Sequence, residues 1–539
     1  MERLLHPSAL YREFLRDPAR VARFYPADHR DLTGLGARAS ARAFPAERRA
    51  AMGAILRRQA ARFGLAADSR DALAAFERGD AVAVVAGQQP GLFGGPLYTL
   101  YKGLTAVALA RRLAAATGRP AVPVFWIASD DHDFEEVRRA HVNDGGPEPR
   151  ALEYPADAAP HGVSFARVRI GDAMEPLLAS LEAMLPPSEF RAPLLGRLRD
   201  AYAPGRSWCE AFARFTGGML APLGALVFDS SDEEAKRLAL PVFEREIELA
   251  GAGARAARET GEALERAGYH AQIARAGDEL NLFWHGDHRE ALRVASDGHL
   301  RLVETGRTLG RDELLRLVRE RPADASPGVL LRPIVQDYLF PTAAYVGGPS
   351  EVSYWAQVDS VYPLFGLEAT PVAPRAGATL LEPRIAKVLE RFGLDWTDLA
   401  GDVEHAIGET LRRMLPEDFP ALIAREREGW QESFARLRDA VTAFDPSLRS
   451  AAETAAGHVA HQGETLEKKL MQVWKRRQEE SVAQIRRAAG QLFPRGGLQE
   501  RTLSVLGFAA RYGPGLAPRI AAALPAPGAH ALIPLGGDA

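Results

Sequence analysis

The sequence predicts an α/β protein with a parallel-sheet core, two insertions in that core and a long antiparallel helical coiled coil. Two observations support this fold class. Short apolar runs and a helical pattern alternate over residues 81–129, as they do in a βαβ unit. Residues 384–491 instead combine few glycines, dense charge and apolar residues seven positions apart, which is typical of a coiled coil.

The composition excludes several classes of protein. Of the 539 residues, 47% are hydrophobic and 25% are charged, as in an ordinary globular chain. The net charge of −3 gives no reason to expect nucleic acid or an anionic membrane as a partner. The single cysteine, Cys209, excludes an intramolecular disulfide framework, and we expect it in the core. The sequence contains no long apolar span and does not begin like a signal peptide, so we expect a soluble, cytoplasmic protein.

The elements follow one another in an order that interleaves core and insertions. Helices are expected over residues 1–80 and 96–118, core strands over 81–87, 121–129 and 225–232, and a long helix over 233–267. The expected division is a first part of the core (1–144), a first insertion (145–215), a core strand (216–234), a second insertion (235–328), a second half of the core (329–383), the coiled-coil domain (384–491) and a segment that returns to the core (492–539).

The loop GQQPGLFGGP joins the first core strand to its helix. Glycines let the backbone approach a ligand, and the start of the next helix favours an anion. The loop matches neither GxxxxGK[ST] nor GxGxxG, so it predicts a phosphate or carboxylate site without a standard nucleotide motif. The alternative is a tight turn, with a lysine that is merely solvated. The candidate cofactor-binding residues here are Gly87, Gln88, Gln89, Gly94, Gly95 and Lys102.

An acidic cluster follows the second core strand. Its candidate catalytic residues are Asp130, Asp131, His132 and Asp133. So many acids at one sheet edge need a positive partner, such as Mg²⁺, an ammonium group or arginines. We assign general-base chemistry to His132 and Asp133, expect the carboxylates to raise the pKa of His132, and assign helix capping to Glu136. The alternative is that the whole cluster only caps a helix. No zinc or other protein-bound metal centre is predicted.

Two later segments carry further candidates. In RPIVQDYLFPTAAYVGGPSEVSYWAQV, polar and aromatic residues surround a Gly-rich turn and suit a substrate with hydroxyl or amine groups. The alternative is a Gly-Pro turn with half-buried tyrosines. In PRAGATLLEPR, Arg375 and Thr379 follow a strand and are candidates for phosphate contact, although 61 arginines make any single one a weak marker. The candidate substrate-binding residues are Gln336, Asp337, Tyr338, Tyr345, Gly347, Gly348, Glu351 and Tyr354.

The coiled-coil region has two arms. Ile423, Trp430, Leu437 and Phe444 are seven apart, with Phe434 and Val441 between them. The segment AFDPSLRS ends this arm, and a second long helix is expected to carry Leu466, Leu470, Val473, Val482 and Ile485. We expect an antiparallel hairpin that serves dimerisation or packing.

Taken together, GQQPGLFGGPLYTLYK, PVFWIASDDHDFEEV, LRPIVQDYLFPTAAYVGGPSEVSYWAQ, PRAGATLLE and GGLQER resemble the bacillithiol-biosynthesis cysteine-adding enzyme family, BshC. The resemblance implies a Rossmann-like core similar to class I aminoacyl-tRNA synthetases and nucleotidylyltransferases. It also implies two connecting-peptide insertions and a coiled coil that pairs two subunits into a homodimer.

The same resemblance implies an activity. The enzyme would add cysteine to the amine of glucosaminyl malate, forming an amide bond in the last step of bacillithiol synthesis. ATP is the implied activator, and Mg²⁺ is a further candidate cofactor. Neither signature of the class I synthetases is literally present. Two alternatives remain: a synthetase-like nucleotidylyltransferase with another substrate, or a nucleotide-binding coiled-coil interaction protein.

Overall fold

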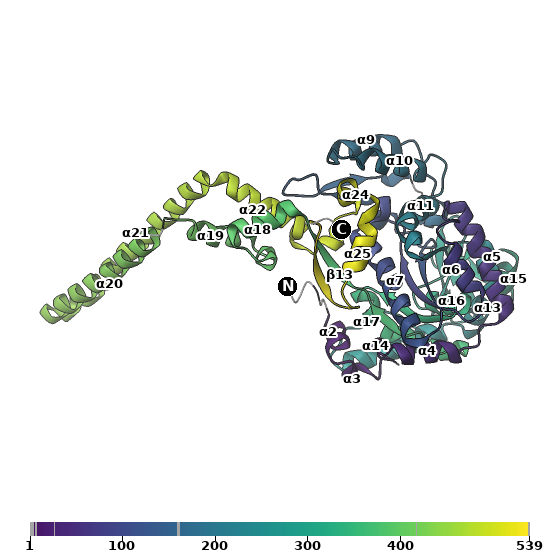
Figure 1. Ribbon diagram of the computed structural model, residues 1–539. Helices are drawn as coiled ribbons and strands as arrows, with labels where there is room; N and C mark the ends of the chain where they lie inside the picture. The colour runs from purple at the N-terminus through teal and green to yellow at the C-terminus, as the bar shows by residue number, and fades with distance from the viewer. Residues whose placement is uncertain (1–4, 6–7, 26, 159–161, 417, 537–539) are drawn as a thin grey trace. The chain divides into compact units, whose positions relative to one another are not determined.

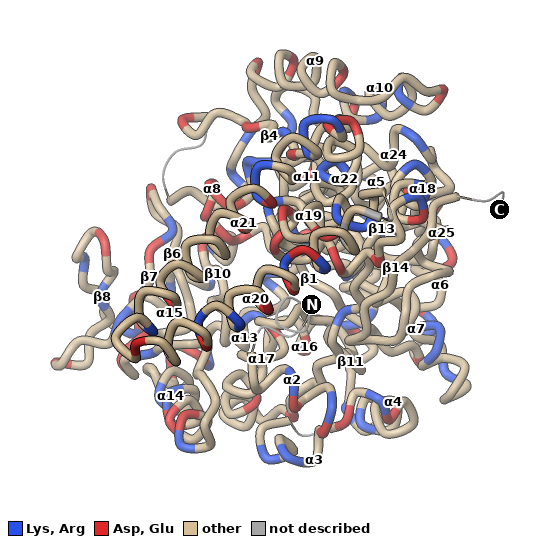
Figure 2. The backbone as a smooth tube through the Cα atoms, turned by 90° about the vertical axis from the view of Figure 1, so that its left-hand side faces the viewer, with Lys and Arg blue, Asp and Glu red and all other residues tan. Residues whose placement is uncertain are grey.

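The computed structural model describes Leu5 and residues 8–25, 27–158, 162–416 and 418–536 (Figure 1). The chain divides into two compact units. The first comprises Met1–Asp144, Pro149–Leu380 and Leu498–Ile533, and the second comprises Gly145–Glu148, Leu381–Gly497 and Pro534–Ala539. Basic and acidic residues are interspersed along the elements (Figure 2), as the near-zero net charge suggests.

The first unit is built on a five-stranded parallel sheet, which confirms the predicted core. Its strands, in the order β12-β11-β1-β2-β5, are β12 (Val372–Pro374), β11 (Thr342–Gly347), β1 (Val82–Gln88), β2 (Ala121–Ile127) and β5 (Leu226–Asp229). The chain runs outward from β1 to β5 and then returns to the other side of β1. The strand order therefore reverses between β1 and β11, and open α/β sheets bind ligands beyond the carboxyl ends of such a pair.

Helices cover both faces of this sheet. On one face α7 (Leu97–Thr117) packs on β1 and β2. On the same face the centre of the Phe125 ring, on β2, lies 6.2 Å from that of Phe212, on α11 (Trp208–Leu220). On the other face, α6 (Arg70–Glu77) contacts β2 and α5 (Ala46–Phe63) contacts β5. There the ring centres of Trp126 and Phe228 are 4.7 Å apart. Because neighbouring strand residues point to opposite faces, the runs AVAVVAG and AVPVFWI are apolar throughout.

The remaining N-terminal helices and the first insertion are short. The helices are α2 (Ala9–Arg16), α3 (Pro18–Val21) and α4 (Leu32–Ala41), and α4 packs on α7. After β2 come α8 (Phe134–Val137), the hairpin of β3 (Arg139–Val142) with β4 (Arg150–Glu153), α9 (Met174–Met184), α10 (Arg191–Ala201) and then α11.

The second insertion differs from the sequence prediction at its start. The expected long helix is three helices: α12 (Glu233–Leu238), α13 (Leu240–Leu249) and α14 (Ala252–Arg266). Pro241 begins a new helix at the first break, and at the second break Ala250 and Gly251 take φ of 46° and 80°. The alanine-rich pattern continues across both breaks, so periodicity does not reveal them.

An antiparallel sheet completes this insertion. Its order is β10 (Ala325–Pro327), β6 (Glu279–His285), β7 (Arg289–Val294), β8 (Leu300–Leu302) and β9 (Thr308–Leu309), and α15 (Arg311–Glu320) lies between β9 and β10 in the chain. The helices α16 (Arg332–Leu339) and α17 (Pro349–Asp359) then flank β11. Near the C-terminus, α23 (Gln499–Thr502) and α25 (Leu516–Ala523) contact α7, α24 (Leu506–Tyr512) lies between them in the chain, and β13 (Gly377–Leu381) pairs with β14 (His530–Pro534).

The second unit is helical and contains the predicted coiled-coil hairpin. Its helices are α18 (Pro383–Phe392), α19 (Val403–Arg413), α20 (Asp418–Phe444), α21 (Arg449–Arg477) and α22 (Glu479–Leu492). The long pair α20 and α21 lies side by side (Figure 1), joined by a turn in which Asp445 accepts a hydrogen bond of 2.9 Å from the Ser447 N–H. The second arm is shorter than expected, because α21 ends at Arg477 and Val482 and Ile485 belong to α22. Within the described residues, no helix has the length and apolarity needed to cross a membrane.

Candidate active site

A cavity of about 590 Å³ lies in the first unit, where the parallel strands end. The ends of β1, β2, β5 and β11 all contribute residues to it, and the second insertion contributes others. This is the place that the reversal of strand order predicts for a ligand. Its walls include Gly87, Gln88, Gln89, Tyr98, Lys102, Asp130, Asp131, Glu136, Ser230, Arg275, Arg289, Arg332, Tyr345, Gly348, Glu351, Tyr354, Arg375 and Arg501.

A buried ion pair joins the two strands on either side of the switch point. The Lys102 ammonium donates to Gly87 O at 2.9 Å, to Gln88 Oε1 at 2.8 Å and to the Glu351 carboxylate. Glu351 also accepts hydrogen bonds from the Tyr345 hydroxyl at 2.6 Å and from the Gly348 N–H at 2.7 Å. Burial raises the pKa of Glu351, but Lys102 and the hydrogen bonds from Tyr345 and Gly348 together more than offset it and leave that pKa below its ordinary value.

This geometry changes the role expected for Lys102. An ammonium has three protons, and the three acceptors around Lys102 use all of them. The predicted contact between Lys102 and a phosphate is therefore absent from this arrangement of the described residues. Lys102 instead ties the end of β1 to Glu351, and so holds the two sides of the cavity together.

The glycines of the predicted anion loop divide into two groups. Gly87, together with Gln88 and Gln89, lines the cavity, and a Cβ on Gly87 would lie 3.2 Å from the Tyr345 hydroxyl. Gly94 and Gly95 are not among the residues that line it. They take φ of 90° and 69°, and a Cβ on Gly94 would lie 3.2 Å from the Phe215 ring. Their glycine requirement is therefore a matter of backbone conformation and packing on α11.

The acidic cluster also divides. Asp130 is paired with Lys236 of α12 at 2.6 Å. Asp131 and Glu136 share Gln89, whose Nε2 donates to both carboxylates at 3.2 Å. Burial, together with the negative charges of Asp131 and Asp133, raises the pKa of Glu136. Asp133 is exposed and caps α8, accepting a hydrogen bond of 3.3 Å from the Glu136 N–H. The expected roles are thus exchanged: Asp133 caps the helix, and Glu136 lines the cavity.

His132 differs from its predicted chemical state. Arg289 Nη1 donates to His132 Nδ1 at 3.1 Å, and because a guanidinium can only donate, this contact assigns the His132 proton to Nε2. Burial, followed by the nearby Arg289 charge, lowers the pKa of His132. The neighbouring carboxylates were expected to raise it, but their effect is smaller. In this arrangement His132 is a hydrogen-bond donor at Nε2.

Half of the predicted substrate-binding residues line the cavity, namely Tyr345, Gly348, Glu351 and Tyr354. Gln336, Asp337, Tyr338 and Gly347 are not among its lining residues. Asp337 accepts hydrogen bonds from Tyr362 at 2.8 Å and Thr370 at 2.5 Å, and burial raises its pKa. The Arg48 guanidinium lies 3.6 Å from the centre of the Tyr338 ring. The face of α16 that carries these residues therefore holds the helix in place.

Of the two residues predicted in PRAGATLLEPR, only Arg375 lines the cavity. It is buried and paired with Glu500 of α23 at 2.5 Å. Thr379 is fully buried in β13 and shares a hydrogen bond of 2.9 Å with His530 Nε2. It is not among the residues that line the cavity, so a phosphate contact is not supported by its place in the fold.

Several lining residues were missed in the sequence. Arg275, Arg289 and Arg332 reach the cavity from the second insertion and the start of α16. Among 61 arginines no pattern distinguishes them. Lys236, which holds Asp130, could have been found, because it is one of only six lysines.

A parallel sheet with a polar cavity at its topological switch point defines a Rossmann-like protein with a small-molecule site. Two family models match the chain: the N-terminal Rossmann-like domain of bacillithiol biosynthesis BshC over residues 2–376, and the C-terminal coiled-coil domain of BshC over residues 378–534. The chain belongs to the BshC family.

Curated relatives agree with this assignment. A protein of Salinibacter ruber named "Putative cysteine ligase BshC" is 36% identical over 508 residues, covering 94% of this chain and 92% of its own length. Proteins of the same name from Koribacter versatilis and Solibacter usitatus are each 32% identical and cover 94% and 96% of this chain, and 94% and 95% of their own lengths. A solved structure titled as a putative arginyl-tRNA synthetase from Campylobacter jejuni spans 78% of this chain and 94% of its own at 10% identity, with a TM-score of 0.22 that is too low to argue from.

Proposed function

We propose that this protein is a cysteine ligase of bacillithiol synthesis, which joins the carboxyl group of cysteine to the amine of glucosaminyl malate. The observation that carries the proposal is the polar cavity at the switch point of the sheet, in a chain of the BshC family. The names of the relatives support the same activity. The cavity holds both cations and carboxylates, as a site for a carboxylate and an amine requires.

ATP is the activator that we propose. We place its phosphates beside Gly87–Gln89, which line the cavity where β1 ends. Activation gives the cysteine carboxylate a leaving group: one carboxylate oxygen departs with the phosphorus atom when the amide bond forms. Mg²⁺, if it accompanies ATP, would be held mainly by phosphate oxygens, because no cluster of three ligating side chains is present among the described residues.

The amine must lose a proton to attack. His132 presents an N–H toward its surroundings, so the acceptor is better sought among the carboxylates that share Gln89. Glu136 fits this role because its raised pKa brings it closer to the working pH of a general base. Asp131 and Glu136 together would hold the substrate ammonium before the proton leaves.

The test is a product assay. Purified protein is incubated with glucosaminyl malate, cysteine and ATP, and bacillithiol is measured by mass spectrometry after thiol labelling. We expect product in wild type and a loss of roughly 10²- to 10⁴-fold in kcat for Glu136→Gln. Wild type that forms no bacillithiol under these conditions would contradict the proposal.

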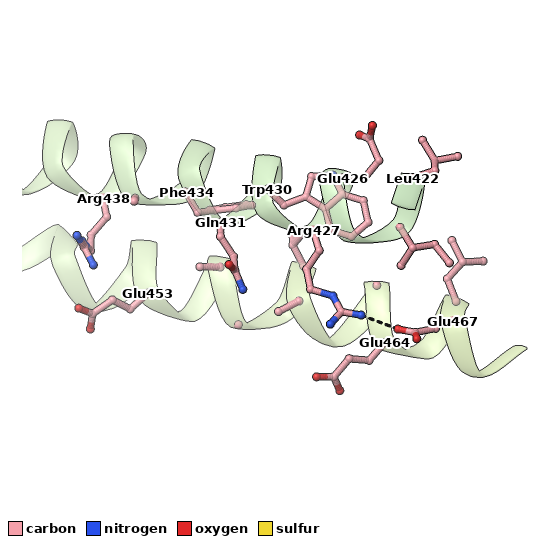
Figure 3. Close-up of a pocket in the computed structure, with 18 of the residues that line it drawn as sticks. Leu422, Glu426, Arg427, Trp430, Gln431, Phe434, Arg438, Glu453, Glu464 and Glu467 are labelled. Carbon is pink, nitrogen blue, oxygen red and sulfur yellow. Dashed lines mark hydrogen bonds and ion pairs between the residues drawn. The ribbon is translucent and has the colours of Figure 1, made fainter. Parts of the chain in front are cut away.

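We also propose a homodimer through the coiled coil. A groove of about 820 Å³ runs between α20 and α21 (Figure 3), lined by apolar residues that include Leu422, Trp430, Phe434 and Leu466. Trp430 packs over Gly463, where a Cβ would lie 2.7 Å from its ring, and Arg427 bonds to Glu467 at 2.7 Å. Leu466 is nevertheless 66% exposed. An apolar seam of this kind on a heptad-bearing hairpin suits a second copy of the same hairpin.

A further inference from the structure

Arginines without a carboxylate partner gather on one wall of the cavity. Arg289 comes from β7, Arg332 from α16 and Arg275 from the loop before β6, and all three line the cavity. Among the described residues, none of the three lies within ion-pair distance of an acid, whereas Lys102 and Arg375 are both paired. Buried charges are costly unless they are compensated, and the acids near these arginines act on them only from beyond ion-pair distance, Asp130 and Asp131 on Arg289 and Glu351 on Arg332.

The guanidiniums are held in place by groups that leave their charge intact. Arg289 donates from Nε to Ser326 Oγ at 3.0 Å and from Nη2 to Pro327 O at 3.3 Å, and it stacks 3.7 Å from the centre of the Phe283 ring. These partners are neutral. They fix the orientation of the fork, which is the condition for bidentate recognition of an oxyanion.

Arg332 is held on the same segment of chain. The backbone N–H of Arg332 donates to Gly328 O at 2.8 Å, one residue after the Pro327 carbonyl that Arg289 contacts. The Arg332 guanidinium lies 4.7 Å from the centre of the Tyr345 ring. Arg332 Nη1 donates to Gln336 at 3.0 Å, but within the described part of the chain its buried Nη2 has no hydrogen-bond partner. The Nε of Arg275 lacks one as well.

We infer that Arg289, Arg332 and Arg275 form a subsite for a dianion, and that its occupant is the dicarboxylate of the malyl group of the acceptor substrate. The identity of the occupant rests on the proposed function, whereas the subsite itself rests on the arginines. The phosphates of ATP share the same chemistry. The binding experiment below distinguishes the dicarboxylate from the phosphates, because Arg332, over the Tyr345 ring, lies near Gly87 as well.

The test measures binding and needs no turnover. Malate and ATP are titrated separately into the full chain by calorimetry, for wild type, Arg289→Met and Arg332→Met. Methionine keeps an unbranched apolar stem against Phe283 or Tyr345 and removes the charge. Arg301→Met is the matched control, since Arg301 is an exposed arginine of β8 in the same insertion and is not among the residues that line the cavity. Lactate, a monocarboxylate, is the matched ligand control.

We expect each of the two variants to weaken malate binding by roughly 10- to 100-fold while ATP binding changes by less than about twofold. Arg301→Met should change malate binding by less than about twofold, because its charge is exposed and lies outside the cavity lining. Lactate should bind more weakly than malate to wild type. Thermal unfolding of both variants checks that they are folded at the temperature of the titration. Since the two arginines lie on different elements, either variant suffices if the other does not fold.

Three outcomes would overturn the inference: no malate binding to wild type, malate binding that both variants leave unchanged, or loss of ATP binding in place of malate binding. The last would assign the arginines to phosphate. Failure of the proposed function looks different. If the product assay is negative but malate binding follows the arginines, the subsite stands and the ligase activity does not. If product forms and malate binding ignores the arginines, the reverse holds.

Discussion

Two hollows in the two units of the chain are lined by opposite kinds of side chain. The cavity of about 590 Å³ in the first unit has charged walls, yet Arg289, which has no carboxylate within ion-pair distance among the described residues, is only 8% exposed. The groove of about 820 Å³ in the second unit has apolar walls, yet Trp430 and Leu466 are 40% and 66% exposed. Buried charge and exposed apolar surface are both unfavourable in a free protein, and each points to a partner of matching chemistry.

The comparison therefore separates two kinds of recognition. The cavity is organised by ion pairs and hydrogen bonds that fix polar groups before a small polar ligand arrives. The groove offers a largely apolar area with one ion pair, Arg427–Glu467, and such a surface suits another protein. Each prediction below removes one element of this contrast.

The largest effect is expected from breaking the Lys102–Glu351 pair. Lys102→Met or Glu351→Gln leaves one charge or one set of donors buried without compensation, which costs about 3–5 kcal/mol of stability. The double variant removes both charges and should lose less than either single variant. Denaturant unfolding of the four proteins as a double-mutant cycle measures this. If the stability losses of the two single variants add up to the loss of the double variant, the pair does not organise the cavity.

The groove is tested at Leu466. Leu466→Glu places a charge on the exposed seam and should weaken a dimer at least about 100-fold, or about 3 kcal/mol, since each copy loses one buried leucine. Gln462→Glu adds the same charge on the same helix, away from the groove lining, and should leave the mass unchanged. Light scattering at micromolar concentration gives the mass. If the wild type is monomeric, the groove does not bind a second copy, and its contrast with the ligand cavity no longer holds.

Glu246 is a further buried carboxyl group, and it extends the comparison because, unlike Glu351, it is not paired with a cation among the described residues. Glu246 of α13 is fully buried and accepts hydrogen bonds from the Asn281 N–H at 2.7 Å and the Asn281 side chain at 3.2 Å. Burial raises its pKa to about 7. A raised folded-state pKa stabilises the fold below the unfolded value of 4.5, and this stability is lost as the pH rises through about 7.

Glu246→Gln should therefore become more stable relative to wild type as the pH rises. Between about pH 5 and about pH 7.5 we expect the difference in unfolding free energy to change by roughly 2 kcal/mol in favour of the variant. Urea unfolding at several pH values measures it. A difference independent of pH would mean that Glu246 is already ionised at the lower pH.

The spacing of apolar residues along the chain was sufficient to predict the main elements of the fold. The parallel sheet and the helical hairpin follow from spacings of apolar residues along the chain, and those spacings reflect which side chains are buried. The cavity lining that was predicted, such as Gly87, Asp131 and Gly348, lies at or shortly after the end of a strand, where topology alone brings residues together.

The rest depended on tertiary packing. Arg289 enters the cavity from an antiparallel sheet, and Arg275 from the loop before it, and no periodicity encodes the position of either. The state of His132 is set by Arg289, which is 157 positions away in the sequence. Likewise Gln336 and Asp337 have polar side chains suited to a substrate, but they lie on the face of α16 that packs against the protein itself.

The smallest effect is expected at Asp133. Its side chain accepts one hydrogen bond from the Glu136 N–H at the start of α8, and asparagine caps a helix about as well as aspartate. Asp133→Asn should thus change stability by less than about 0.5 kcal/mol and leave kcat within about twofold, whereas Asp133→Ala should lose about 1 kcal/mol of stability with kcat retained. Glu136→Gln, three residues along, should do the opposite and lower kcat with little loss of stability. Measuring kcat and the unfolding midpoint for the three variants decides between the two assignments. A large fall in kcat for Asp133→Asn would return the catalytic role to Asp133, because the only change in that variant is the loss of a charge at an exposed position.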